Sequence, residues 1–132
     1  MRSPRWIGAA VLGFVAMTLA QGQGSPNKAP SYDVKAEVVV RGKVTAVVAI
    51  PDWMGKNGVN VTLQAPDSVL VHVDTAPAEF LKMLDFAIMN GDDLEVTGVW
   101  ARWDGNRVLL ARIVTRQKVA VSVRDLEGKP VW

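Results

Sequence analysis

The sequence predicts a mostly β fold with one short helix: a five-stranded Greek-key barrel followed by an extra C-terminal strand. Three observations predict it. Valines alternate with polar residues in several short stretches, which is typical of half-buried strands. A single stretch near the middle changes to helical spacing, and clusters of Gly, Pro, Asn and Asp separate the stretches.

The first predicted strand is long and covers residues 32–50. Val38 and Val40 precede Gly42 at alternate positions, and Val44 and Val48 continue the alternation beyond it. We expect a bulge or a bend at Gly42. A long strand that bends can pair with a neighbour on each side, which is what the closure of a small barrel requires.

Two further strands and a helix should follow. The strands are predicted at 59–64 and 69–74, separated by a turn at 65–68 that contains proline and aspartate. The spacing of Phe80, Leu81 and Leu84 then predicts a helix over 77–86. Thr75 is a candidate cap for this helix, and Pro77 lies near its first turn.

The C-terminal third reads as three more strands. They are predicted at 94–103, 107–115 and 119–124. Asp104, Gly105 and Asn106 form the turn of a hairpin between the first two, because these residue types tolerate the backbone angles of tight turns. This order of elements, with a helix between the third and fourth strands, is that of the OB-fold. An SH3-like barrel is the alternative, but it does not normally place a helix there.

The N-terminus is predicted to be a removable export signal. Arg2 and Arg5 give a positive start, residues 6–19 are apolar and uncharged, and Thr18 and Ala20 are small residues near the expected cleavage point. We therefore expect a signal peptide at 1–20, a disordered leader at 21–31 and one domain at 32–132. An uncleaved membrane anchor is the alternative. The predicted location is periplasmic or secreted, without stable membrane insertion after cleavage.

Charge and cysteine content exclude several classes of protein. The chain has fifteen Lys and Arg and thirteen Asp and Glu, and loss of Arg2 and Arg5 leaves thirteen of each. A strongly basic nucleic-acid-binding protein has a different balance. Acids dominate residues 67–95 and bases dominate 102–129, which predicts an acidic and a basic side. The absence of cysteine excludes disulfides and thiolate metal sites, and we predict no cofactor.

Four short stretches carry a resemblance to a group of known proteins. They are Val40-Arg41-Gly42-Lys43-Val44, Leu94-Glu95-Val96-Thr97-Gly98, Val108-Leu109-Leu110-Ala111-Arg112 and the ending at 123–132. On these stretches the chain resembles small secreted bacterial OB-fold proteins of uncharacterised role. Such proteins often have Leu-Gly-Pro after the third strand, where this chain has Thr75-Ala76-Pro77. The resemblance implies the fold and export but no reaction.

No residue pattern indicates catalysis or a metal. His72 is the single histidine and shares a strand face with Leu70 and Asp74, so we interpret it as a half-exposed strand residue rather than a ligand or general base. Haem handling through this histidine is a weaker alternative. Asp92, Asp93 and Glu95 lack the spacing of a calcium loop. With no nucleophile motif in the sequence, the chain is predicted not to be an enzyme.

The candidate binding residues are aromatic and basic side chains near two predicted loops. They are Trp53, Trp100, Arg102, Trp103, Arg107, Arg112 and Arg116. OB-folds commonly bind ligands between the loop after the first strand and the loop joining the fourth and fifth strands, and both loops here carry tryptophan. In the alternative interpretation the tryptophans fill the barrel ends and the arginines are solvated. Alternation places Trp100 and Trp103 on opposite faces of their strand.

These observations favour an exported, non-enzymatic binding or adaptor module that recognises a protein, a peptide or a small ligand. Single-stranded nucleic-acid binding through the basic side of the fourth and fifth strands is the alternative, since aromatic rings can stack on bases. The zero net charge of the mature chain weighs against it. The oligomeric state does not follow from the sequence.

Overall fold

The computed structural model describes residues 30–103 and 105–132. The predicted signal peptide and residues 21–29 of the predicted leader lie outside this part of the chain. Pro30, which the sequence assigns to the leader, is buried. Within the described residues, no helix combines the length and the apolar character that crossing a membrane requires.

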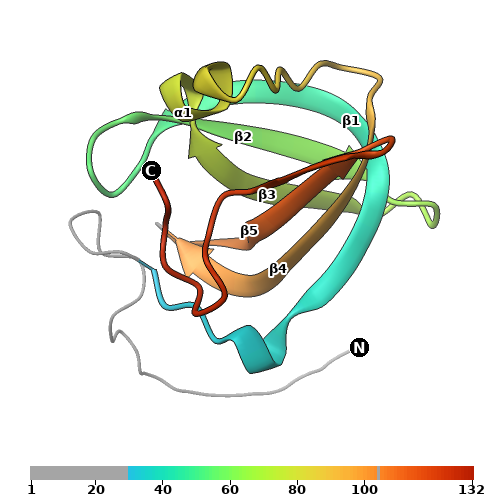
Figure 1. Ribbon diagram of the computed structural model, residues 1–132. Coiled ribbons are helices and arrows are strands. Elements are labelled where there is room, and N and C mark those ends of the chain that lie inside the picture. Colours follow the sequence, from blue (N-terminus) through green and yellow to red (C-terminus); the bar gives the residue numbers. More distant parts are fainter. Residues whose placement is uncertain (1–29, 104) are drawn as a thin grey trace, which may run out of the picture.

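Six strands form one sheet, and five of them close into a ring (Figure 1). Their bounds are β1 Val38–Pro51, β2 Asn57–Gln64, β3 Leu70–Pro77, β4 Asp93–Trp103, β5 Asn106–Arg116 and β6 Val119–Ser122. Neighbours pair in the order β3-β2-β1-β4-β5-β6, all antiparallel. A parallel pairing between β3 and β5 closes the ring at Val73 and Asp74. The predicted class, a five-stranded barrel with one helix and an extra strand, is confirmed.

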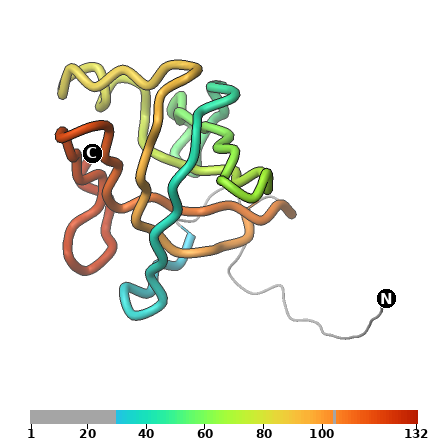
Figure 2. Tube along the Cα trace, turned by 90° about the vertical axis from the view of Figure 1, so that its right-hand side faces the viewer, coloured from blue at the N-terminus to red at the C-terminus, as the bar shows by residue number. Residues whose placement is uncertain are grey.

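β1 is the long strand that makes this closure work, and Figure 2 shows it running the height of the molecule. Its first part pairs with β4 through residue 43, and its second part pairs with β2 from residue 43 onward. The bulge falls between Val44 and Ala46 rather than at Gly42. Gly42 serves close packing instead: a Cβ there would lie 2.8 Å from the carbonyl oxygen of Gln64. Residues 34–36, predicted as strand, form a 3₁₀ turn.

The helix is shorter than predicted and lacks the predicted cap. α1 covers Ala78–Met83, and Pro77 occupies the N-cap position without a side-chain hydrogen bond. Thr75 is buried within β3, where its hydroxyl donates a hydrogen bond to the carbonyl of Val59. The pairing of Pro77 with Gly58 extends β3 three residues beyond its predicted end, so Pro77 belongs to the strand and not to the helix. Asp85, at a φ of 55°, follows the helix end.

The barrel interior holds the main apolar core, to which every barrel strand and α1 contribute. Its fully buried members include Leu63, Val73, Val96, Leu109 and Val114. Burial of such side chains contributes about 1.5–3 kcal/mol each relative to exposure, so this core dominates the stability of the fold.

A second apolar cluster lies on the outer face of β4 and β5. Val99, Val108 and Leu110 are buried there, and Tyr32 and Trp103 pack against them. Tyr32 and the C-terminal segment both lie close to this face: Arg124 places its guanidinium 5.3 Å from the centre of the Tyr32 ring and 5.7 Å from that of Trp132. A Cβ on Gly128 would overlap the Tyr32 ring, so the C-terminal segment packs directly on Tyr32. The outside of the barrel is therefore covered here.

Candidate functional site

A groove opens on the outer face of β2 and β3, at the end of the barrel where the β1–β2 loop and the β4–β5 turn lie. It consists of two adjoining hollows of about 320 and 390 Å³ that share the side chains of Ile50, Asn60, Asn106 and Val108. The first hollow is also lined by Pro51, Asp52, Asp74 and Trp103, and the second by Val48, Val61, Thr62, His72 and Arg107.

Strand alternation determines which side chains line this groove. Val71 and Val73 point into the core, so His72 and Asp74 between and after them lie on the outer face of β3. Asn60 is the cross-strand partner of Asp74, which places the two side chains on the same face. The sequence-based interpretation that His72 and Asp74 share a face is thereby confirmed.

The groove has an apolar rim on one side. Val48 and Ile50 project from the outer face of β1 and are 51% and 44% exposed. Exposed apolar side chains beside convergent polar groups are typical of ligand-binding clefts.

Asp74 is the most perturbed acid of the described chain. Burial raises the pKa of its carboxyl to about 6, attraction by the Arg124 guanidinium opposes the rise, and repulsion by the Asp52 carboxylate adds to it. No described residue donates a hydrogen bond to Asp74 or lies within ion-pair distance of it. A carboxylate withdrawn from water without a partner is costly, which is the physical cause of the raised pKa.

Asp52 reaches the same hollow from the β1–β2 loop. One carboxylate oxygen accepts hydrogen bonds of 2.8 Å from the backbone N–H groups of Met54 and of Lys56, which fixes the loop. The other oxygen, Oδ2, is buried and has no hydrogen-bond partner among the described residues. The loop therefore delivers a second carboxylate oxygen whose acceptor capacity is unused.

Three of the seven predicted binding residues meet at or beside the groove. Trp103 lines the first hollow and packs on the outer apolar cluster. Arg107 lines the second hollow and holds its guanidinium 3.8 Å from the centre of the Trp100 ring. Trp100 packs against the barrel core, so the two tryptophans of β4 lie on opposite faces, as alternation predicts.

Trp53 and Arg102 lie near this end of the barrel without lining either hollow. Trp53 is half-buried in the β1–β2 loop, and its indole N–H is buried without an acceptor in the described structure. Arg102 is exposed and stands opposite Arg107 in the β4–β5 pairing.

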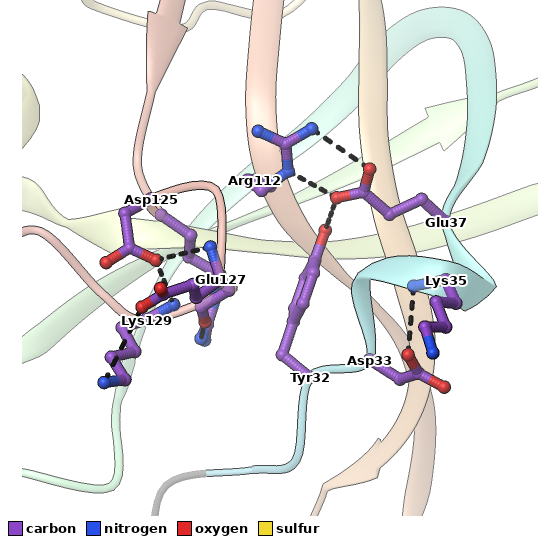
Figure 3. A network of polar contacts seen from close by, with 10 residues as sticks. Tyr32, Asp33, Lys35, Glu37, Arg112, Asp125, Glu127 and Lys129 are labelled. Atoms are coloured by element: carbon purple, nitrogen blue, oxygen red, sulfur yellow. Dashed lines mark hydrogen bonds and ion pairs between the residues drawn. The ribbon is translucent and has the colours of Figure 1, made fainter.

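Arg112 belongs to a structural clamp rather than to a binding surface. Its guanidinium donates two hydrogen bonds to the Glu37 carboxylate, and the Tyr32 hydroxyl donates a third at 2.5 Å (Figure 3). These bonds hold the pKa of Glu37 below its usual range, with the Arg112 hydrogen bonds as the largest cause. Arg112 is the extra residue of a bulge in β5, which turns its side chain toward the segment before β1.

Arg116 is also engaged in structure, at the other end of β5. It donates to the carbonyl of Ala87, lies 3.4 Å from the Asp92 carboxylate and places its guanidinium 4.5 Å from the centre of the Phe86 ring. The arginines expected to form one surface are therefore divided between the groove, the clamp and the segment after α1.

Three acids of the predicted acidic stretch pair with bases on neighbouring strands. Glu95 binds Arg41 and Asp93 binds Lys43 across the β1–β4 pairing, while Asp92 faces Arg116. The three acids weighed as calcium ligands thus each have a basic partner. Across residues 30–103 and 105–132, no group of three or more metal-binding side chains is assembled.

A larger hollow, of about 520 Å³, lies at the opposite end of the barrel beside Gly42, Gln64 and Thr115. Its charged walls are Arg41, Lys43, Asp93 and Glu95, which already pair with one another. It offers fewer unsatisfied groups than the smaller groove, so we place the candidate site in the groove.

Sequence reasoning missed Asp52, Asn60 and Asp74. Asp74 reads as an ordinary outward-facing strand residue and Asp52 as a loop residue. The one available signal was that Asp74 follows His72 on the face that OB-folds use for ligands. Nothing in the spacing shows that the C-terminal segment brings Arg124 and withdraws Asp74 from water.

Comparison with known proteins assigns the chain to a family. Residues 37–121, more than half of the chain, match the model of the MamS/MamX magnetosome protein family. The chain belongs to this family. The match begins at the clamp residue Glu37 and ends within β6, so it contains the whole barrel and the groove. It supports the expectation of a bacterial protein. No curated protein matches the chain.

Proposed function

We propose that this chain is an exported, non-enzymatic binding module with an OB-fold, that it acts at or near magnetosomes, and that it takes its ligand in the groove between the β1–β2 loop and the β4–β5 turn. One observation carries the proposal: the groove combines exposed apolar side chains with a buried carboxylate oxygen of Asp52 that has no partner among the described residues, beside the carboxylate of Asp74. The ligand is a protein, a peptide or a small molecule.

The connection order of the strands supports the OB-fold assignment. Closure by a parallel β3–β5 pairing, with α1 between β3 and β4, is the arrangement of that fold. In OB-folds the face of strands two and three is the usual ligand surface, and the groove lies on it. The fold supports the place of binding.

Binding is favoured over catalysis by the environment of the polar groups. His72 is exposed, and its Nδ1 atom lies 3.3 Å from the Thr62 hydroxyl; among the described residues, no carboxylate binds the ring. A general base needs such an orienting group and a nucleophile within reach. The same exposed position gives no enclosed pocket for haem.

The magnetosome connection follows from the name of the family alone. It predicts that, in a host that makes magnetosomes, the chain is recovered with them. The expected signal peptide at 1–20 predicts in addition that the first residue of the recovered chain is Gln21. Mass spectrometry of the N-terminal peptide from purified magnetosomes tests both points. Recovery only in the cytoplasm with Met1 retained would contradict export.

Use of the groove is tested by a matched pair of substitutions. Ile50→Gln changes the groove rim, whereas Leu70→Gln changes an equally exposed side chain on the same face outside either hollow. Chemical crosslinking in the host should lose its specific products with Ile50→Gln and keep them with Leu70→Gln. Identical crosslinked products from both variants would contradict the groove as the binding site.

Nucleic-acid binding is less favoured by the structure than by the sequence, because Arg112 and Arg116 form ion pairs with Glu37 and Asp92. Only Arg102 and Arg107 remain for phosphates on β4 and β5. A salt titration of oligonucleotide affinity separates the two functions, since phosphate binding weakens steeply with salt. Tight binding at low salt that is lost in the Arg102→Ala, Arg107→Ala variant would favour the nucleic-acid function instead.

A further inference from the structure

We propose that the groove binds a cationic organic group, a primary ammonium or a guanidinium, with Asp74 at its base as the counter-ion. This inference rests on the proposed function, because it names the chemistry of the ligand that the groove takes. Such a group is carried by a free amine or by a lysine or arginine side chain of a peptide.

The negative charge of Asp74 has no close partner among the described residues. Its carboxylate lines the hollow on the outer face of β3 and receives no hydrogen bond from the described residues. Arg124 attracts it from the C-terminal segment, but that guanidinium donates to the carbonyl of Gly128 and sits between two aromatic rings. A buried charge with only a distant partner is stabilised most by a donor placed directly against it.

A second carboxylate, from Asp52 in the β1–β2 loop, faces the same hollow. Asp52 lines the same hollow, and its Oδ2 atom is buried with no hydrogen-bond partner in the described chain. Burial is the main cause of the raised pKa of Asp74, and repulsion by the Asp52 carboxylate adds to it. A cation between the two would replace this repulsion by two attractions and would satisfy both acceptors.

The remaining walls fit an organic cation. Trp103 lines the hollow, and the face of an indole ring attracts ammonium and guanidinium groups. Asn60 lies directly across from Asp74 in the β2–β3 pairing and brings an amide to the same wall. Ile50 and Val108 provide apolar surface for the methylene chain that carries such a group.

Other ligand classes fit less well. An anion would meet two carboxylates. Calcium and magnesium ions need six or more oxygen ligands at close range, and the described residues gather no set of three acidic or histidine ligands. A hollow of about 320 Å³ is large for an ion and suits the end of a side chain.

The experiment follows the amide and indole signals of the protein purified from the exporting host by two-dimensional NMR. The titrants are 1,5-diaminopentane and, as a matched neutral compound, 1,5-pentanediol. The diamine should shift the signals of Asn60, Asp74 and Trp103, and the diol should not. Equal shifts with both compounds, or no shift with the diamine, would overturn the cationic ligand.

Two variants locate the counter-ion. Asp74→Asn should weaken binding of the diamine at least tenfold, while Glu79→Gln, which removes an exposed carboxylate on α1, should change it less than twofold. Unchanged affinity in Asp74→Asn would overturn the role of Asp74. Binding should also weaken roughly tenfold from pH 8 to pH 5, because the Asp74 carboxylate becomes protonated over this range. The charged groups that act on this titration are Arg124, which lowers the pKa of Asp74, and Asp52, which raises it.

Two further titrations separate the sources and the rival. The tripeptide Ala-Lys-Ala compared with Ala-Gln-Ala tests a peptide-borne ammonium, and calcium chloride tests a metal site. Shifts with calcium but not with the diamine would overturn the inference. If no titrant binds but Ile50→Gln still abolishes crosslinking in the host, the cationic ligand is refuted and the binding function stands. If Ile50→Gln and Leu70→Gln give the same crosslinked products, the groove is refuted as the binding site.

Discussion

Two carboxylates on the outside of this barrel, Glu37 and Asp74, differ in their hydrogen-bond partners and in the direction of their pKa shifts. Glu37 accepts hydrogen bonds from the Arg112 guanidinium and the Tyr32 hydroxyl, and its pKa is lowered. Asp74 has a comparable position on the outer face, lacks any such donor and has its pKa raised to about 6. The same chemical group thus stabilises the folded state at one site and opposes it at the other.

The difference teaches where the fold leaves a charge available. The clamp around Glu37 is complete within the chain, so it ties the segment before β1 to β5 and has no capacity for a ligand (Figure 3). In the groove, no described residue donates a hydrogen bond to Asp74, so a donor from a ligand would stabilise its carboxylate. Strained or unsatisfied groups are expected at functional sites, where the rest of the fold compensates for them.

The largest effect expected from this comparison comes from breaking the clamp. Arg112→Met leaves the half-buried Glu37 carboxylate without its main partner and should lower the free energy of unfolding by about 2–4 kcal/mol. Urea denaturation at pH 7 measures it. Arg102→Met, an exposed arginine on the neighbouring strand, serves as control and should change stability by less than about 0.5 kcal/mol. Equal effects of the two substitutions would refute the clamp.

Neutralising the unpaired acid should have the opposite sign. Asp74→Asn should raise the free energy of unfolding at pH 8 by about 1–3 kcal/mol, because the folded state no longer holds a desolvated carboxylate. Since the folded pKa lies above the unfolded value, the penalty is absent below about pH 4 and complete above about pH 7. The gain should therefore vanish at pH 4. A destabilised variant at pH 8 would contradict the unpaired state of Asp74.

The titrations of Asp74 and Glu37 can be observed directly, and their midpoints should differ. The side-chain carboxyl carbon of Asp74 should titrate with a midpoint of about 6, and that of Glu37 below the ordinary glutamate value. NMR of carboxyl carbons over pH 2–8 measures both. The Glu37 contribution to stability is present above the unfolded pKa and is lost as pH falls through the folded pKa. Coincident midpoints would remove the contrast between the two sites.

The smallest effect is expected at the exposed pair of Arg41 and Glu95, whose side chains are 74% and 36% exposed. A double-mutant cycle with Arg41→Ala and Glu95→Ala should give a coupling of about 0.5 kcal/mol or less, and 0.5 M salt should reduce it. A coupling above 1 kcal/mol would show that exposure does not separate this pair from the clamp.

Much of the fold could be predicted from local patterns. The local patterns predicted all six strands, and the Asp-Gly-Asn sequence placed the β4–β5 turn. The errors lie where tertiary pairing outweighs local signals. Pro77 pairs with Gly58 and continues β3, so the helix begins later than the spacing of Phe80 and Leu81 indicates. The bulge follows the register of β1 on β2 and not the nearest glycine.

The candidate site was predictable only in its location. Tryptophans near two loops pointed to the end of the barrel where the groove lies, and Trp103 and Arg107 line the groove. The arginine series did not stay together, because the bulge at Arg112 turns its side chain toward Glu37, a residue 75 positions away. A partner at that sequence distance leaves no mark in the local pattern.

By itself, the sequence determined the strands, the barrel class and the balance of charge, because these depend on the period of apolar residues and on composition. Only the tertiary structure decided which acids are satisfied and which are not. Burial and pairing depend on neighbours brought from distant parts of the chain. Glu37 gains Arg112, whereas Asp74 is desolvated by burial, with attraction by Arg124 and repulsion by Asp52 as smaller effects. The pKa values of these two acids are therefore properties of the fold rather than of their sequence positions.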